Sequence, residues 1–290
     1  MNSYNYEVVR VVGLARDVQS TVETETIRLK QILGQIFSRV EFFIVESDSS
    51  DLTASKLMYL AKSIPDFSFI SLQSLKAIIP NRIERLIYCR NKYIEWIRNQ
   101  SDSSPIIVID FDLRNTKLRS SQIREALTLL PFADGVFANQ SGRYFDIYAL
   151  RCSGWSDFDC YAEYSVLRQE MGADAAKEIA IWSKMRKINP KEEPIEVDSA
   201  FGGFGIYNCS VFRSFDYSPL KSSGVIESEH VALHKKIRLS GKKLYIDPGL
   251  LNFGWNPHNL SSFKIFRSLD QFTKGKVFVG FRRFIRDKIR

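Results

Sequence analysis

Short apolar runs rich in β-branched residues alternate with helix-patterned stretches through the first half of this chain. The alternation is typical of an α/β protein with a mostly parallel sheet covered by helices. The expected strands span residues 8–15, 41–46, 67–72 and 106–112. The helical patterns between them extend to about residue 37 and cover 51–64 and 82–98. The run 106–112 is the most apolar, so we expect it in the centre of the sheet.

The second half is expected to continue the same domain. Helical patterns cover about 119–129 and 158–188, and strand patterns cover 135–139, 145–150 and 197–208. Residues 227–248 predict a helix, a stop at Gly241 and a further strand. The proline-bounded polar segment 187–194 predicts a loop near a functional site. We therefore expect one domain over residues 1–262, followed by an appendage at 263–290.

The composition is that of an ordinary globular protein. With 290 residues, 44% of them hydrophobic and 26% charged, the chain can bury a large core, which excludes disordered, collagen-like and miniprotein classes. The four cysteines form no CxxC pair, which argues against a zinc site and against a disulfide framework. No window reaches the ~18 apolar residues of a spanning helix, and the N-terminus lacks signal-peptide features. We therefore expect a cytoplasmic location.

The basic charge of the chain is concentrated at its C-terminus. The net charge is +8, and residues 264–290 hold nine Lys and Arg against two Asp, which is +7. Residues 277–290 place aromatic and aliphatic side chains at helical spacings with basic residues between them. We expect this segment to be an amphipathic helix that binds an anionic membrane surface at the inner face of the cell membrane. Alternatively, it packs its phenylalanines on the domain.

Nucleic acid is not expected as a partner. The first 263 residues carry only about +1, and they contain no recognisable nucleic-acid-binding motif. A nucleic-acid-binding protein with a basic tail stays open as an alternative of a different class.

Two aspartates, Asp110 and Asp112, end the most apolar predicted strand. Open α/β sheets bind their ligands at the carboxyl ends of the strands. Two carboxylates this close need a counterion, and a hard divalent cation that is also bound by phosphates is the usual solution. The triplet therefore predicts a site for a hard divalent cation that is also bound by phosphates. The alternative is a pair of solvated loop aspartates.

Polar groups follow the other predicted strands at the same edge. Acids and hydroxyls lie within 45–53, where they suit ribose and base groups or, alternatively, cap the next helix. Basic and amide groups that could face a diphosphate lie after the first strand and inside 82–98, unless they form surface salt bridges. These candidates are Glu46, Asp48, Asp51, Arg16, Arg90 and Asn91. Neither a GxGxxG nor a P-loop motif is present.

The three histidines differ in their context. His230 and His234 lie four residues apart on a predicted helix, but no HExxH motif accompanies them, so a structural role is favoured. Glu229 begins that helix, where a carboxylate could serve as a base or as a hydrogen-bond acceptor. His258 follows the last predicted strand and is the histidine that we expect to bind a metal.

The ordered set of motifs resembles a known enzyme family. ARD after the first strand, VESDSSD after the second, CRN in a helix and DFD after the fourth are followed by YFDIYALR, SAFGGFGIY and SEHVALHKKIRLSGKKLYIDP. This order is similar to nucleotide-sugar glycosyltransferases of the GT-A fold, and more narrowly to the capsule-associated α-1,3-mannosyltransferases and their bacterial relatives in surface polysaccharide synthesis. The resemblance covers roughly residues 8–258.

The resemblance implies a role for each matching residue. Asp112 would bind Mn²⁺ or Mg²⁺ directly, Asp110 would contact the ribose or a metal-bound water, and His258 would be a further metal ligand. The nucleotide would be held by Arg16, Glu46, Asp48 and Asp51, and the diphosphate or donor sugar by Arg90. Phe201, Gly202 and Gly203 would line the acceptor side. Glu229 and His230 occupy the place of a Glu-Asp pair, so the second position departs from the family pattern.

The predicted function is metal-dependent transfer of a hexose from a GDP- or UDP-sugar to a glycan or lipid-linked glycan acceptor. The resemblance favours a retaining reaction; in an inverting one, Glu229 would be the base. A nucleotidyltransferase of related fold stays open, although it normally needs a glycine-rich basic loop after the first strand, and GLARDVQS has one glycine. A non-catalytic carbohydrate-binding module is the remaining alternative.

Overall fold

The computed structural model describes residues 6–222 and 225–254 of the chain. Four strands of the first half pair in parallel in the order β3-β2-β1-β4. They are β1 (Val8–Ala15), β2 (Arg39–Glu46), β3 (Phe67–Ser71) and β4 (Ile106–Asp110). The helices of this half are α1 (Val22–Leu33), α2 (Thr53–Ser63), α3 (Leu75–Ile78) and α4 (Arg82–Arg98).

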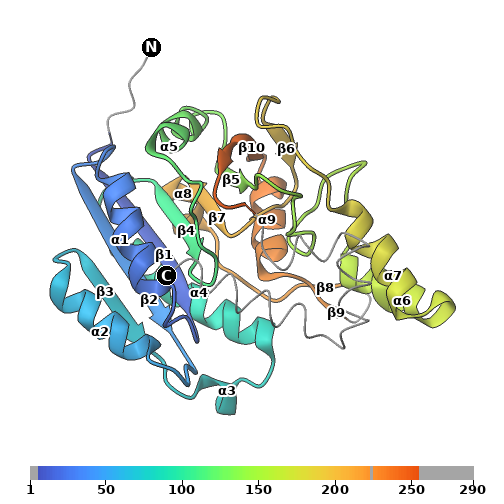
Figure 1. Ribbon diagram of the computed structural model, residues 1–290, viewed down its shortest axis with the longest axis horizontal. Coiled ribbons are helices and arrows are strands. Elements are labelled where there is room, and N and C mark those ends of the chain that lie inside the picture. Colours follow the sequence, from blue (N-terminus) through green and yellow to red (C-terminus); the bar gives the residue numbers. More distant parts are fainter. Residues whose placement is uncertain (1–5, 223–224, 255–290) are drawn as a thin grey trace.

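The second half extends the same sheet beyond β4, to the full order β3-β2-β1-β4-β7-β5-β10-β6 (Figure 1). β7 (Phe204–Tyr207) runs antiparallel between β4 and β5 (Gly135–Asn139), β10 (Leu244–Leu251) is parallel to β5, and β6 (Ile195–Val197) is an antiparallel edge. The helices are α5 (Ser120–Leu127), α6 (Cys160–Met171), α7 (Ala173–Ala180), α8 (Cys209–Ser214) and α9 (Glu229–Leu239), with a 3₁₀ turn at Trp182–Lys184. β8 (Lys221–Ser222) and β9 (Val225–Ile226) pair separately.

Hydrophobic cores lie on both faces of the sheet. Successive residues of a strand point to opposite faces, so Val11 and Phe42 enter one core and their neighbours Val12 and Phe43 enter the other. The first core includes side chains of α1, α2 and α5, and the second includes side chains of α4, α8 and α9. The predicted α/β class, a mostly parallel sheet with flanking helices, is confirmed.

The predicted strand at 145–150 is wrong. This segment forms turns, joined to the rest of the chain by isolated bridges from Arg143 to Lys187 and from Arg151 to Ser199. Its buried apolar side chains, Tyr144, Ile147, Ala149 and Leu150, do not alternate with exposed ones as they would in a strand with one buried face. Irregular burial of this kind suits a turning chain. The segment crosses the end of the sheet instead of joining it.

The expected strand at 197–208 and the expected helix at 158–188 are each interrupted by glycine. Gly202 and Gly203 have φ angles of +68° and +83°, which separate edge strand β6 from interior strand β7. Gly172, at φ +82°, ends α6 before α7 begins. Left-handed φ angles are accessible to glycine at little cost. The chain changes direction at these positions.

Substitution of Gly202 is expected to be costly. A Cβ there would lie 2.7 Å from the carbonyl oxygen of Ala138, whereas a Cβ at Gly172 would meet nothing within 4 Å. Both positions have a left-handed φ, which costs a non-glycine residue about 1–2 kcal/mol. Gly202→Ala should therefore lower the free energy of unfolding in urea by more than about 3 kcal/mol, and the matched control Gly172→Ala by clearly less. Equal losses would contradict the steric argument.

No helix of the described part of the chain is long and apolar enough to cross a membrane. His258 and the predicted membrane-binding segment 263–290 lie outside the described residues, as does the expected domain boundary at residue 262, which stays a prediction.

Candidate active site

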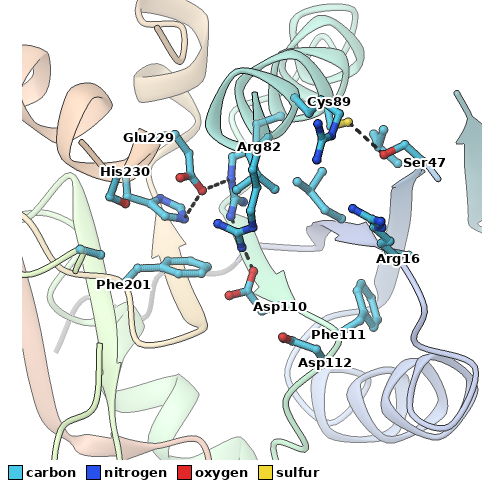
Figure 2. A pocket seen from close by; sticks show the side chains of 18 of the residues that line it. Arg16, Ser47, Arg82, Cys89, Asp110, Phe111, Asp112, Phe201, Glu229 and His230 are labelled. Carbon is cyan, nitrogen blue, oxygen red and sulfur yellow. Dashed lines mark hydrogen bonds and ion pairs between the residues drawn. The ribbon is translucent and has the colours of Figure 1, made fainter. Parts of the chain in front are cut away.

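A cavity of about 340 Å³ opens at the carboxyl ends of β1, β2 and β4. Its walls come from the segments that follow these strands, from one face of α4 and from the start of α9. Figure 2 shows Phe201, Glu229 and His230 on one side, Arg16 and Ser47 on the other, with Asp110 and Asp112 between them. The sequence predicts a ligand site at this edge, and several of the predicted residues meet there.

The paired aspartates follow β4 at the cavity. Asp110 is the last residue of the strand, and Asp112 lies two residues later in an exposed turn. Desolvation raises the pKa of Asp110 to about 7; the Arg90 guanidinium opposes this shift, and neighbouring carboxylates strengthen it. A crowded carboxylate of this kind is stabilised in its charged form by a cation.

Arg90 joins both sides of the cavity. Its side chain is 4% exposed; Nε donates to Glu229 Oε1 at 2.9 Å, and Nη2 lies 3.6 Å from Asp110 Oδ1. The guanidinium carbon also lies 5.6 Å from the centre of the Phe201 ring and 5.5 Å from that of Tyr217. The sequence predicts that Arg90 reaches the diphosphate or donor sugar, and the structure places it between two acids at the cavity wall.

Further arginines face the cavity from α4 and β1. Arg82 and Arg85 line the same cavity as Arg90, and all three residues belong to α4. Arg85 is buried and donates to the carbonyl oxygens of Ile79 and Pro80 at 2.8 and 2.6 Å. Arg16 is half exposed, 3.6 Å from Asp17. These arginines form a basic wall of a cavity whose whole lining also includes five carboxylates.

The acids after β2 separate into two groups. Asp48 lines the cavity, accepts from Lys76 N at 2.7 Å and lies 3.9 Å from Arg85. Glu46 does not line it; this buried side chain accepts from Ser49 N at 3.0 Å.

Asp51 and Asn91 also lie away from this cavity. Asp51 accepts from Thr53 N at 2.9 Å, at the start of α2, and lines a neighbouring hollow. The amide of Asn91 exchanges two 3.0 Å hydrogen bonds with the backbone of Tyr217. These three side chains, Glu46, Asp51 and Asn91, hold loops and helices around the site. The N-cap residue of α2 is Leu52, and no side chain caps this helix, so the helix-capping alternative for Asp51 is wrong.

Phe201 lines the cavity, but the two glycines after it do not. Gly202 N donates to Asp146 Oδ2 at 2.9 Å, and a Cβ on Gly203 would lie 2.3 Å from Leu113 Cδ1. The glycines therefore permit tight packing beneath the site.

Asp146 and Tyr148 are cavity residues that sequence reasoning missed. Burial raises the pKa of Asp146, which accepts from two backbone amides. Tyr148 donates to Ile226 O at 3.1 Å. The motif YFDIYALR contains both residues, but its apolar residues predict a strand. The sequence therefore does not indicate the turn that places Asp146 and Tyr148 at the cavity. Arg82 and Arg85 were missed because a helical period by itself does not show which face meets a ligand.

The raised pKa of Asp110 predicts a pH dependence of stability. Between about pH 4 and 7 the native state binds more protons than the unfolded state, so this group lowers stability as pH rises. In thermal unfolding without metal, Asp110→Asn should therefore gain stability relative to the parent as pH rises through this range.

The control variant is Asp102→Asn, for which the expected change of stability with pH has the opposite sign. A hydrogen bond with Arg10 lowers the pKa of Asp102, so Asp102 stabilises the native state above about pH 4. Asp102→Asn should be less stable than the parent at neutral pH, and the deficit should shrink in acid. If the stability of both variants relative to the parent changed with pH in the same direction, the raised pKa assigned to Asp110 would be refuted.

The donor set fits a divalent cation that also binds phosphate. Among residues 6–222 and 225–254, no group of three or more His, Cys, Asp or Glu side chains is arranged as a complete metal site. Asp110 and Asp112 nevertheless offer oxygen atoms, which Mn²⁺ and Mg²⁺ prefer, and such cations commonly take their other ligands from phosphates and water. Burial, and to a smaller extent the neighbouring carboxylates, raises the pKa of Asp110, and a bound cation would stabilise its charged form.

Comparisons with known proteins find likeness at the level of structure. No protein-family model and no curated protein sequence matches the chain. Solved structures similar to it include a mannosyltransferase from Pyrobaculum calidifontis in complex with GDP-Man and Mn²⁺ (14% identity, TM-score 0.48, covering 87% of this chain and 57% of that one). This chain thus spans less than two thirds of that protein.

Two synthases are also similar. One is glucosyl-3-phosphoglycerate synthase from Mycobacterium tuberculosis with Mn²⁺, UDP and phosphoglyceric acid (13% identity, TM-score 0.40, 86% and 67% of the two chains). The other is mannosyl-3-phosphoglycerate synthase from Rubrobacter xylanophilus (14% identity, TM-score 0.42, 98% and 75%). At such identities the likeness concerns the fold, so the chemistry of this site rests on its own residues.

Proposed function

We propose that this chain is a metal-dependent glycosyltransferase that moves a hexose from a GDP- or UDP-sugar to a glycan or lipid-linked glycan acceptor in surface polysaccharide synthesis. The observation that carries the proposal is the meeting of Asp110 and Asp112 with an arginine-lined helix face in one cavity at the carboxyl ends of parallel strands. Diphosphates bind where cations and guanidinium groups face them, and open α/β sheets place ligands at this edge.

The charges lining the cavity explain the need for a metal. Four arginines and five carboxylates line it. The lining as a whole is therefore slightly acidic and does not by itself favour an anionic nucleotide. A divalent cation bound by Asp112, with Asp110 beside it, would reverse that balance and neutralise charge on the leaving diphosphate. Arg16, Arg82 and Arg85 would hold the phosphates from the basic wall, bidentately where geometry allows.

The ion pair between Arg90 and Glu229 supports a retaining reaction. Glu229 Oε1 accepts from the buried guanidinium of Arg90 at 2.9 Å, so this oxygen already has a partner within the protein. We infer that Glu229 positions Arg90. In a retaining reaction the departing phosphate can take the proton of the acceptor hydroxyl. The anomeric configuration of the product, read by NMR, tests this assignment directly.

The test of the function is ligand binding followed by turnover. GDP or UDP with Mn²⁺ should raise the thermal midpoint by mass action, and the matching nucleotide sugar should then release its nucleoside diphosphate when an acceptor is supplied. Nucleoside monophosphates serve as the control, because they lack the second phosphate. If neither diphosphate shifts the midpoint, the proposal fails. A preference for nucleoside triphosphates, with pyrophosphate released from a sugar phosphate, would support the nucleotidyltransferase instead.

We also propose that the tail at 263–290 binds an anionic membrane surface and brings the site to a lipid-linked acceptor. Its sequence charge of +7 over residues 264–290 could supply about 1 kcal/mol per basic residue near such a surface. The full chain should float with anionic liposomes at low salt, and a variant with Arg282, Arg283 and Arg286 changed to glutamine should float less. Equal flotation of the two chains would contradict the proposal that this segment binds the membrane through its basic residues.

A further inference from the structure

Two histidines one turn apart on α9 have opposite surroundings. His234 is fully buried, and its ring nitrogens lie 2.9 Å from the hydroxyls of Ser199 and Tyr207. His230 is 3% exposed, yet neither of its ring nitrogens has a hydrogen-bond partner among the described residues. Buried polar groups in proteins are nearly always paired, and an unpaired one is costly. The difference calls for a partner at His230.

The ring of His230 is held in place at the cavity. It stacks on Phe201 with centroids 3.9 Å apart and an angle of 21°, and it meets the Tyr217 ring edge to face at 5.7 Å. Its Nε2 lies 3.8 Å from Glu229 Oε1, which is too long for a hydrogen bond. His230 lines the cavity, whereas His234 does not. Figure 2 shows the imidazole between Glu229 and Phe201.

The chemistry of a neutral imidazole selects its partner. Burial and the nearby positive charge of Arg90 lower the pKa of His230 well below its usual value, so the ring presents one N–H donor and one acceptor nitrogen. A hydroxyl group, which both donates and accepts, can pair with either nitrogen. A phosphate oxygen accepts only, and the arginines of α4 and β1 suit it better. A hydroxyl can also take the place of a water molecule at the imidazole while keeping its hydrogen bonds, so little binding free energy is lost.

We propose that His230 hydrogen-bonds a hydroxyl of the transferred sugar and thereby positions and selects it. This inference rests on the proposed function and names the part of the substrate that this side of the cavity contacts. The stacking on Phe201 and the adjacent Arg90–Glu229 pair fix the ring, so a sugar whose hydroxyl lies elsewhere would leave both His230 and its own hydroxyl unpaired. Sites built in this way discriminate strongly against substrates that lack the matching group.

The test uses the small number of histidines in the full chain. With three histidines, a sample labelled with ¹⁵N at histidine has few imidazole signals, and His230→Phe and His234→Gln assign the two on α9. Each nucleoside diphosphate, GDP or UDP, is compared with its sugar, GDP-mannose or UDP-glucose, in the presence of Mg²⁺. The sugar nucleotide should shift the His230 nitrogens beyond the shift caused by the diphosphate. The paired His234 should respond little to either.

Affinity supplies a second readout. His230→Phe keeps a ring that can stack on Phe201 but removes both nitrogens. It should weaken binding of the sugar nucleotide by about five- to tenfold, as expected for one lost hydrogen bond, and leave binding of the nucleoside diphosphate within about twofold. His230→Gln, which keeps a donor and an acceptor, should recover part of the loss. Thermal midpoints establish that both variants are folded.

The outcomes separate the two proposals. If diphosphate and sugar nucleotide both bind but move the His230 signals equally, or if His230→Phe loses affinity for both alike, the proposal for His230 is overturned while the glycosyltransferase proposal stands. If neither ligand binds, the proposed function fails and this inference fails with it. A sugar-specific shift at His230 together with selective loss in His230→Phe supports it.

Discussion

Replacing Asp112 with asparagine is expected to reduce sugar transfer by about a thousandfold or more while leaving the protein folded. The change keeps the shape of the side chain and removes its negative charge at the mouth of the cavity, where Asp112 is exposed. The free energy of unfolding should change by about 0.5 kcal/mol or less, as for other surface positions. Release of nucleoside diphosphate from the sugar nucleotide measures the rate, and urea unfolding measures stability.

The control is Asp66→Asn. Asp66 is a partly exposed carboxylate just before β3, at the amino end of the sheet and away from the cavity, and it pairs with Arg39. Its substitution should leave transfer unchanged. Parental activity of Asp112→Asn, or full activity of the parent in excess chelator, would refute the metal-binding role of this aspartate.

Replacing Arg90 with methionine is expected to destabilise the protein by about 3–5 kcal/mol and to abolish transfer. Methionine fills much of the same volume, so the main loss is the guanidinium. Glu229, whose side chain is 6% exposed, would be left buried without its 2.9 Å partner, and Asp110 would lose its nearby positive charge. Urea unfolding should show the change in midpoint with little change in slope.

Two further variants isolate the cause. Arg98→Met removes an arginine at the end of the same helix that is 36% exposed, and it should cost about 1 kcal/mol or less. Adding Glu229→Gln to Arg90→Met removes the unpaired charge and should recover part of the stability without restoring transfer. Two results would contradict this explanation. Arg90→Met could lose no more stability than Arg98→Met, or the double variant could recover none of the stability that Arg90→Met loses.

The strands and helices near the site follow from local patterns. The run at 106–110 is apolar at every position before Asp110, and a strand buried on both faces requires this. The apolar spacing over 82–98 predicts α4, whose observed ends are the same. Hydrophobic periods of two and 3.6 residues are local properties, so one sequence is enough to read them. The position of Asp110 and Asp112 at the edge of the sheet then follows from the rule for parallel strands.

The strand pattern at 145–150 shows where local reading fails. Its buried residues have irregular spacing in a turning segment, and a few apolar residues of mixed spacing do not distinguish such a turn from a strand. Asp146 therefore reaches the cavity through a conformation that only packing over the end of the sheet establishes. Gly202 contributes to this packing, because its backbone amide holds the Asp146 carboxylate.

Local sequence patterns predict most of the strands and helices and the edge at which the acids gather, because each depends on neighbours a few residues away. Which side chains pair with one another becomes visible in the folded chain alone. Arg90 and Glu229 are 139 residues apart, and His230 has no hydrogen-bond partner among the described residues while His234 has two. Such long-range contacts follow from the spatial order of the eight strands in the described sheet. That order depends on the whole chain at once.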